Sequence, residues 1–288
     1  MNKKIKVKAP AKINYTLEIL GKRPDGYHNL KSIMQTINLY DYLTISVSLY
    51  PENNIILNSQ SPEIPLDSSN TVYKATEKFL KKAKLFGLNI NIDIEKNIPT
   101  RSGLGGGSSD AAAVLLGLNK LFLEPLSEEE INKICASIGS DVNFCLKGGA
   151  ALCTSRGEIT EPIGFVEQNI SLIKPKNFGV STKDAYSLFA ASEDKQVPNN
   201  TEKLCALMNE GKFDENLLFN SFEKVLFNNY QELKTVKELL PDSLMTGSGA
   251  AFFMLEPKIE TDIDLNKYIV FEGLKTIPSG AEVVYYEE

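Results

Sequence analysis

Apolar residues in the first half of the chain follow strand and helix periodicities in turn. They occupy every second position in Ile13–Ile19 and Leu43–Leu49, which predicts half-buried strands. Asn70 then stands where a helix N-cap belongs, before apolar residues at helical spacing in Val72–Ala83. Strand alternation returns in Ile90–Ile94. The amino-terminal half is therefore expected to combine a sheet with helices.

A glycine-rich segment joins the strand that ends near Lys96 to the next helix. It runs from Pro99 to Asp110 as PTRSGLGGGSSD, and the alanine- and leucine-rich residues Asp110–Leu121 predict the helix. Glycines let the backbone turn its N–H groups toward an anion, and the helix adds the positive end of its dipole. A flexible linker is the alternative, but linkers do not run from an alternating strand directly into a well-formed helix. The segment therefore predicts a phosphate site.

This phosphate site matches neither of two common nucleotide motifs. No lysine follows the glycines as in a P-loop, and the G-x-G-x-x-G spacing of dinucleotide folds is absent. Ser108 and Ser109 leave two compatible interpretations open, because their hydroxyl groups can bind Mg²⁺ or phosphate, or can cap the helix.

The pattern changes after about residue 160. Before that point, Ser127 and Glu130 form a capping box that opens one more helix. Beyond it, short strands alternate with helical stretches, and these strands are expected at Ser171–Lys174, Ala251–Leu255, Tyr268–Phe271 and Glu282–Tyr286. We therefore expect an α+β fold with two domains, an ATP-binding domain in residues 1–160 and a second domain in residues 161–288.

Composition excludes several classes of protein. The chain has 288 residues, 42% of them hydrophobic, and a net charge of −6 with no long run of one sign, which argues against a nucleic-acid or membrane partner. Four cysteines without a C-x-x-C pair, with a single histidine, make a zinc site hard to assemble and predict buried thiols. Since no apolar run approaches the roughly 20 residues of a membrane span, a cytoplasmic protein is expected.

Phosphoryl transfer to an alcohol needs a group that takes the hydroxyl proton and a cation that balances developing charge. Asp141 is a candidate for the first role, because GSDVNF places it at a turn between a helix and an expected apolar strand. Lys12 is a candidate for the second role, because it opens the first long strand in PAKIN. Spacing alone favours the alternative for both residues, a solvated surface charge.

Two further segments have simple default interpretations. The only histidine, His28, lies in the turn sequence RPDGYH, and without a G-x-S-x-G elbow it gives no support to a Ser-His-Asp hydrolase. Composition alone makes it a loop residue. The segment Met245–Ala250, MTGSGA, is a second glycine-rich turn before an apolar strand, and by itself it predicts a hairpin connection.

The order of these pieces resembles the GHMP kinase family. The matching segments extend over nearly the whole chain: PAKIN at 10–14, GKRPDGYH at 21–28, SGLGGGSSDAA at 102–112, GSDV at 139–142, RGE at 156–158 and MTGSGA at 245–250. The resemblance implies a ribosomal-protein-like amino-terminal domain, a ferredoxin-like carboxy-terminal domain and an active site in the cleft between them.

PAKIN and RPDGYH further resemble the branch of the family that acts on a cytidine-diphosphate-linked polyol. The implied reaction uses ATP, with Mg²⁺ as the default metal, to phosphorylate the 2-hydroxyl of 4-diphosphocytidyl-2-C-methyl-D-erythritol in the non-mevalonate isoprenoid pathway. Asp141 would be the general base, Lys12 would lower the pKa of the substrate hydroxyl and balance charge, and Asn14 would orient the erythritol. No resident metal site and no macromolecular partner are implied.

The resemblance also assigns binding residues by motif. Tyr27 and His28 would hold the cytosine by stacking and hydrogen bonding, with Tyr186 as the second aromatic face. Thr182 and the glycine-rich turn would complete the substrate site, the latter through Gly247, Ser248 and Gly249. The residues expected to bind ATP are Asn70, Lys96, Pro99, Gly103, Leu104, Gly105, Gly106, Gly107, Ser108 and Ser109.

Some positions depart from the family pattern, and two alternative functions remain open. Arg101 and Ser102 stand where small residues are usual, Thr246 stands where serine is common, and Asn143 and Ala250 stand where proline is common. A kinase of the same family acting on a smaller alcohol such as homoserine is one alternative, against which the RPDGYH turn argues. A non-catalytic ligand- or RNA-binding module is the other, against which the acidic balance argues. The chain is expected to be a monomer or a homodimer.

Overall fold

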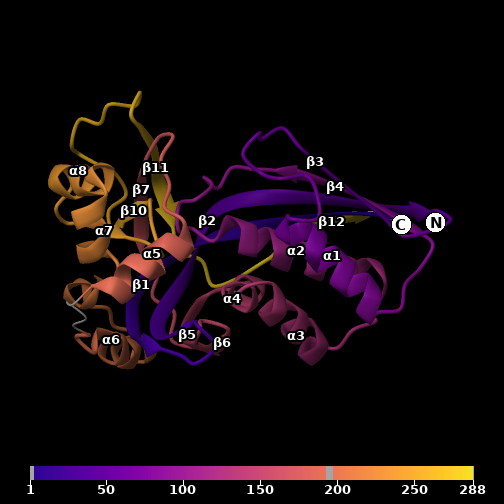
Figure 1. Ribbon diagram of the computed structural model, residues 1–288, viewed down its shortest axis with the longest axis horizontal. Helices are drawn as coiled ribbons and strands as arrows, with labels where there is room; N and C mark the ends of the chain where they lie inside the picture. Colours follow the sequence, from indigo (N-terminus) through magenta and orange to yellow (C-terminus); the bar gives the residue numbers. More distant parts are fainter. Residues whose placement is uncertain (1–2, 193–196, 288) are drawn as a thin grey trace.

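The computed structural model describes residues 3–192 and 197–287 and contains two β-sheets with helices packed against them (Figure 1). The helices are α1 (Thr71–Lys82), α2 (Gly106–Leu121), α3 (Glu128–Ile138), α4 (Val142–Lys147), α5 (Thr182–Ala191), α6 (Asn200–Asn209), the 3₁₀ turn η1 (Glu215–Leu217), α7 (Glu223–Asn229) and α8 (Gln231–Leu239). The strands are β1 (Lys3–Lys22), β2 (His28–Leu49), β3 (Asn54–Ser59), β4 (Leu88–Glu95), β5 (Ala150–Ser155), β6 (Ile159–Pro162), β7 (Asn169–Pro175), β8 (Phe219–Asn220), β9 (Leu244–Met245), β10 (Phe252–Met254), β11 (Tyr268–Lys275) and β12 (Glu282–Glu287).

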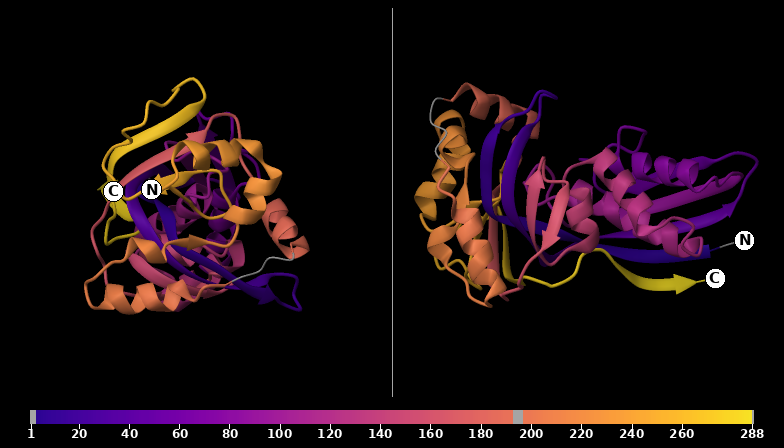
Figure 2. Two further views of the ribbon diagram at one scale, coloured as in Figure 1. Left: turned by 90° about the vertical axis from the view of Figure 1, so that its left-hand side faces the viewer. Right: turned by 90° about the horizontal axis from the view of Figure 1, so that it is seen from below.

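The strands β1 and β2 form one long antiparallel hairpin that runs through both parts of the molecule (Figure 2). The alternating pattern predicted only Ile13–Ile19 and Leu43–Leu49 of strands of 20 and 22 residues, and Ile13–Ile19 is buried on both faces rather than half-buried. Their register shifts at three places, and such bulges bend a strand and increase its twist. The hairpin therefore links the two parts of the molecule.

The first sheet has the order β12-β1-β2-β4-β3, with β5, β6 and β8 attached beside this path. Helices α1 to α4 cover one face of this sheet (Figure 1). The N-cap prediction for α1 is confirmed, since the Asn70 side chain accepts a hydrogen bond from the Val72 N–H at 2.8 Å. The capping box of Ser127 and Glu130 at the start of α3 is confirmed as well.

The second sheet has the order β11-β7-β10-β9 and is covered by helices that include α7 and α8. The half of the hairpin nearer its turn packs on this second sheet. There, Ile13 and Ile33 share a buried apolar cluster with Leu172 and Phe253. The strands β1 and β2 thus belong to the first sheet and pack against the second. The domain boundary between residues 160 and 161 stays a prediction.

Three predicted elements are wrong in part. The strand expected at Glu282–Tyr286 exists as β12, but it pairs with β1 in the first sheet rather than joining the second unit, a long-range choice that local alternation does not encode. The apolar strand expected after Asp141 is the helix α4, because a short apolar run is compatible with either structure. Helix α2 begins at Gly106 and not at Asp110, since glycines lower helix propensity but the helix start tolerates them.

Three of the cysteines, Cys135, Cys145 and Cys153, are buried as predicted, while Cys205 is partly exposed. Burial raises the pKa of the Cys135 thiol to about 12, which keeps this group protonated at neutral pH. Among the described residues, no helix has both the length and the apolar character needed to span a bilayer.

Candidate active site

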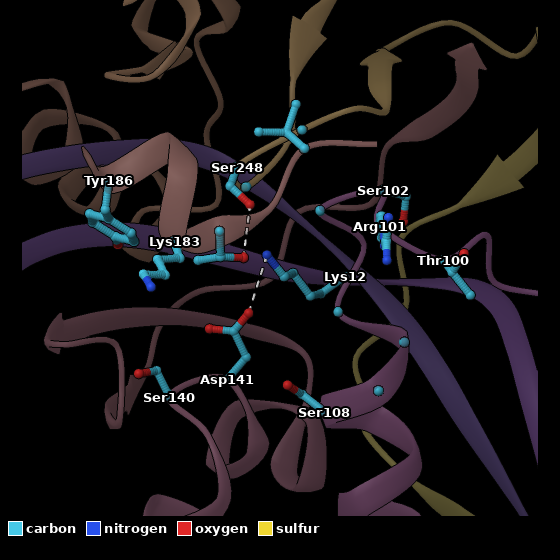
Figure 3. Close-up of a pocket in the computed structure, with 18 of the residues that line it drawn as sticks. Lys12, Thr100, Arg101, Ser102, Ser108, Ser140, Asp141, Lys183, Tyr186 and Ser248 are labelled. Carbon is cyan, nitrogen blue, oxygen red and sulfur yellow. Dashed lines mark hydrogen bonds and ion pairs between the residues drawn. The ribbon is translucent and has the colours of Figure 1, made fainter. Parts of the chain in front are cut away.

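A cavity of about 1220 Å³ lies where the two parts of the molecule meet, between the glycine-rich segment, β1, α5 and the residues just before α4 (Figure 3). The structure brings together almost all of the predicted site residues around it. Those that line it are Lys12, Asn14, Tyr27, His28, Asn70, Lys96, Pro99, Gly103, Gly105, Gly106, Gly107, Ser108, Asp141, Thr182, Tyr186, Gly247, Ser248 and Gly249.

The two remaining predicted residues, Leu104 and Ser109, hold the glycine-rich segment against β1. The Leu104 side chain is buried and its carbonyl accepts a hydrogen bond from the Lys12 N–H at 2.9 Å. The Ser109 hydroxyl donates to the Pro10 carbonyl at 2.7 Å and is fully buried. Of the two serines, only Ser108 faces the cavity (Figure 3).

The glycine-rich segment forms the amino-terminal turn of α2. Gly105 is the N-cap residue with φ 75°, a conformation that glycine adopts without strain, and no side chain caps the first turn. Gly106 and Gly107 place their backbone directly at the cavity wall. Because the first N–H groups of a helix lack intrahelical partners and carry the positive end of the dipole, this turn is suited to bind phosphate.

Lys12 and Asp141 meet in the same cavity. The Lys12 ammonium lies 3.4 Å from the Asp141 carboxylate and donates a hydrogen bond to Asn14 Oδ1 at 2.7 Å. Asp141 is the N-cap residue of α4, but its side chain caps no N–H group of that helix and points toward Lys12 (Figure 3). The surface-charge alternative therefore does not hold for Lys12, whose side chain is only 4% exposed, or for Asp141, which is paired with it.

Lys12 lies between the two glycine-rich segments. A methyl group on Gly105 would come within 2.9 Å of Lys12 Cγ, and one on Gly247 within 3.3 Å of its ammonium nitrogen. Both glycines also have positive φ. Small residues are thus needed on both sides for the ammonium to reach the start of α2.

A group of buried charged side chains lies below the first turn of α2, and the sequence predicted only one of them, Lys96, as a site residue. Lys96, predicted near the nucleotide, forms ion pairs with Asp41 and, at 2.6 Å, with Asp110. The remaining oxygen of Asp41 accepts hydrogen bonds from the N–H groups of Asn97 and Ile98 at 2.6 and 2.8 Å. The signal for Asp41 was available, because it stands at an inward position of the alternating strand β2, where a lone carboxylate needs a partner.

The electrostatics of this group follow from two carboxylates sharing one cation. Burial raises the pKa of Asp110 to about 7; Lys96 opposes the rise and Asp41 adds to it. For Lys96, burial works to lower the pKa, but the two carboxylates outweigh it and the net shift is upward. Lys96 is therefore charged and fixed at the base of the first turn of α2.

Comparison with known proteins agrees with this geometry. The family described as GHMP kinases N terminal domain matches residues 70–149. The 4-diphosphocytidyl-2-C-methyl-D-erythritol kinase of Caldicellulosiruptor bescii is 42% identical over 86% of this chain and 88% of its own length. The protein of the same name from Clostridium botulinum strain Kyoto is 39% identical over 91% and 96% of the two chains. The chain belongs to the 4-diphosphocytidyl-2-C-methyl-D-erythritol kinase family.

Solved structures of related kinases share the fold. A crystal structure of 4-(cytidine 5'-diphospho)-2C-methyl-D-erythritol kinase aligns with a TM-score of 0.67 and 29% identity, covering 87% of this chain and 90% of that one. A homoserine kinase from Cytophaga hutchinsonii aligns with a TM-score of 0.73 but only 18% identity, over 98% and 97% of the chains, and shows the fold alone. The expected two-domain fold of the GHMP kinases is thereby confirmed.

The end of the cavity away from the glycine-rich segment has an aromatic wall, which the family resemblance assigns to cytosine. The rings of His28 and Tyr186 stack with centroids 5.1 Å apart and planes 21° apart, so no base fits between them as they stand. Tyr27 is half exposed, and the Arg156 guanidinium lies over its ring at 4.7 Å. His28 is thus the first residue of β2 and part of a wall, not a free loop residue.

The second glycine-rich turn connects β9 to β10, as a hairpin connection should, and it also contacts the first. Thr182 and Ser248 are joined by a hydrogen bond between their hydroxyl groups at 3.1 Å. A methyl group on Gly103 would lie 2.1 Å from the Thr246 carbonyl oxygen, so this close approach requires glycine. The segment Met245–Ala250 is therefore both a hairpin connection, as its sequence alone predicted, and part of the cavity wall.

Proposed function

We propose that the protein transfers the γ-phosphate of ATP to the 2-hydroxyl of 4-diphosphocytidyl-2-C-methyl-D-erythritol, a step of the non-mevalonate isoprenoid pathway. The observation that carries this proposal is the Lys12–Asp141 pair beside a side-chain-free helix start, in a chain 42% identical to a kinase named for that substrate. Phosphoryl transfer to an alcohol needs a site for the phosphates, a cation and a carboxylate at the hydroxyl, and these groups meet here.

The chemistry assigned to the pair follows from its geometry. Asp141 accepts the proton of the attacking hydroxyl, while the Lys12 ammonium, 3.4 Å away, balances the negative charge that develops on the transferred group. Asn14 is the proposed third member, although its amide oxygen is already bound to Lys12 at 2.7 Å. Any contact of Asn14 with the erythritol therefore comes from its amide nitrogen.

ATP fits the first turn of α2, where Gly106, Gly107 and Ser108 line the cavity. For Mg²⁺, the described residues contain no group of three or more metal-binding side chains. The Ser108 hydroxyl is an oxygen donor at the cavity, and Mg²⁺ in kinases takes few protein ligands beside the phosphates. We therefore propose that Mg²⁺ enters with ATP and that the Ser108 hydroxyl faces it.

Cytosine recognition is proposed for the aromatic wall of Tyr27, His28 and Tyr186, with Thr182 and Gly247–Gly249 closing the site. Because His28 and Tyr186 already stack, the base is proposed to lie against this wall rather than between these two rings. A monomer or homodimer in the cytoplasm remains our proposal for the state and location of the protein.

The proposal is tested by measuring ADP release with ATP, Mg²⁺ and one acceptor at a time. The acceptors are 4-diphosphocytidyl-2-C-methyl-D-erythritol, homoserine and mevalonate. ADP release with the cytidine-linked polyol alone is the expected result. Release with homoserine alone would keep the family fold but replace the substrate, and silence with every acceptor would favour a binding role. Cytidine nucleotides are expected to compete with the substrate.

A further inference from the structure

The amide of Asn14 is held by three hydrogen bonds to neighbouring side chains. Its oxygen accepts from the Lys12 ammonium at 2.7 Å and from the Thr246 hydroxyl at 3.3 Å, and its nitrogen donates to the Ser32 hydroxyl at 2.8 Å. The four side chains are 4% exposed or less. Asn14 lines the cavity, whereas Ser32 and Thr246 stand behind it and do not.

The donors in this group allow a single arrangement. An ammonium carries only hydrogens, so the atom of Asn14 that faces Lys12 is the amide oxygen, and the amide nitrogen faces Ser32. The Ser32 hydroxyl donates its hydrogen to the Thr16 carbonyl oxygen at 2.6 Å, so it accepts the hydrogen bond from Asn14. A reversed amide would place N–H groups against the ammonium.

Ser32 reaches this position because of an irregularity in the hairpin. The register of β1 and β2 shifts between Asn14 and Thr16, which turns the two strands relative to each other at this point. Beside the shift, the Thr16 hydroxyl accepts a hydrogen bond from the Ile33 N–H at 3.0 Å. Side chains thus complete the hydrogen bonding at the shift, and one of them fixes the Asn14 amide.

Thr246 reaches Asn14 from the opposite direction, from the turn after β9 of the second sheet. Its hydroxyl accepts from the Asn14 backbone N–H at 3.0 Å and donates to the amide oxygen, so it bridges two groups of one residue. The Thr246 carbonyl lies against Gly103 of the phosphate-binding segment. A displacement of this turn would therefore move the Asn14 amide and, because the amide oxygen accepts a hydrogen bond from Lys12, would also move the Lys12 ammonium.

We propose that Ser32 and Thr246 are positioning residues for Lys12. Together they hold the Asn14 amide in the one orientation that presents its oxygen to the ammonium, and that oxygen fixes Lys12 beside Asp141 and the phosphate-binding turn. Neither residue touches the reacting atoms. The inference rests on the proposed function, because it refines the role of Lys12 in phosphoryl transfer.

Two substitutions of Thr246 separate the contribution of its hydroxyl group to catalysis from that of its side-chain volume. Thr246→Val keeps the volume and removes both hydrogen bonds, whereas Thr246→Ser keeps the hydroxyl. We expect Thr246→Val to lower kcat about tenfold with KM for ATP changed less than about twofold, and Thr246→Ser to restore kcat. Thr235→Val, the same exchange on the exposed face of α8 outside the cavity, is the control and leaves both constants unchanged.

A second readout is independent of turnover. Trace acetylation of the native protein, followed by peptide mass spectrometry, compares the reactivity of Lys12 with that of the exposed Lys267. Thr246→Val is expected to raise the acetylation of Lys12 relative to Lys267 several-fold, and Thr246→Ser is expected to leave it at the wild-type value. If the wild type phosphorylates no acceptor, the proposed function fails, and the acetylation ratio still decides the positioning role.

Ser32→Ala approaches the amide from the other side and replaces Thr246→Val if that variant does not fold. It removes the acceptor of the Asn14 nitrogen, so kcat and the acetylation ratio are expected to change in the same direction. The inference is overturned if Thr246→Val has wild-type kcat and Lys12 reactivity. It is overturned equally if Thr246→Ser is as impaired as Thr246→Val, because shape and not the hydroxyl would then be decisive.

Discussion

Asp141 occupies the N-cap position of α4 without using its carboxylate as a cap, although a first-turn N–H group is the usual partner of such a side chain. Its partner is instead Lys12 on β1, at 3.4 Å. Helix stability is therefore not what this carboxylate supplies, and its removal should affect chemistry more than folding.

Replacing Asp141 by asparagine keeps the shape of the side chain and removes its ability to accept a proton. We expect Asp141→Asn to bind ATP like the wild type while kcat falls about 10²- to 10⁴-fold, the usual loss of a general base. Calorimetric titration with ATP and the ADP-release assay measure the two quantities. Near-normal turnover would remove Asp141 from the proposed role.

Asp110 gives the buried charges a pH dependence of defined sign. Burial raises its pKa to about 7, against about 3.9 in an unfolded chain, so between these values the native protein binds more protons than the unfolded one. The free energy of unfolding therefore decreases from this group as pH rises through that window. Relative to Asp110→Asn, the wild type should lose stability from pH 4.5 to pH 8.

Urea denaturation of wild type and Asp110→Asn across this range measures the difference directly. Both proteins share all other titrating groups, so their difference isolates Asp110 to first order. A wild-type advantage that grows with pH would show that Lys96 outweighs burial at this site and that the Asp110 carboxylate is charged throughout.

At the scale of elements, the first turn of α2 distinguishes two adjacent glycines. A methyl group on Gly107 meets only the Thr71 hydroxyl at 3.5 Å, whereas one on Gly106 presses on Ile98, Lys96 and Asp41 at 3.2 to 3.4 Å. Alanine favours the helix over glycine by about 1 kcal/mol. We expect Gly107→Ala to raise the melting temperature of the ligand-free protein and Gly106→Ala to lower it.

Differential scanning calorimetry without nucleotide checks this pair, because the phosphate site then plays no part. Equal shifts in both variants would mean that Gly106 is free to accept a side chain and that the charges around Lys96 do not restrict the turn.

At the scale of the whole molecule, the hairpin of β1 and β2 contributes side chains to three buried apolar clusters, two of which include residues of the second sheet. Strand β12 also returns from the end of the chain to pair with β1. We expect the two parts to unfold together, as one calorimetric transition whose van't Hoff and calorimetric enthalpies agree. Two resolved transitions would indicate that the hairpin does not couple them.

The extent to which sequence predicted this structure also depends on scale. Local signals worked where the physics is local, as at the Asn70 cap, the capping box of Ser127 and the glycine-rich turn. Lys12 and Asp141 looked like surface charges from spacing, and only the family motifs brought them together. The partner of β12 and the contacts of Thr246 were not predictable, because they join residues more than 200 positions apart.

The central claim, phosphorylation of one hydroxyl of a cytidine-linked polyol, is tested most directly on the product. We would follow ATP, Mg²⁺ and 4-diphosphocytidyl-2-C-methyl-D-erythritol with the protein by ³¹P nuclear magnetic resonance. The account predicts a new phosphomonoester signal that couples to the polyol and grows in step with ADP, while the diphosphate signals of the substrate persist. Growth of ADP with inorganic phosphate alone would contradict it.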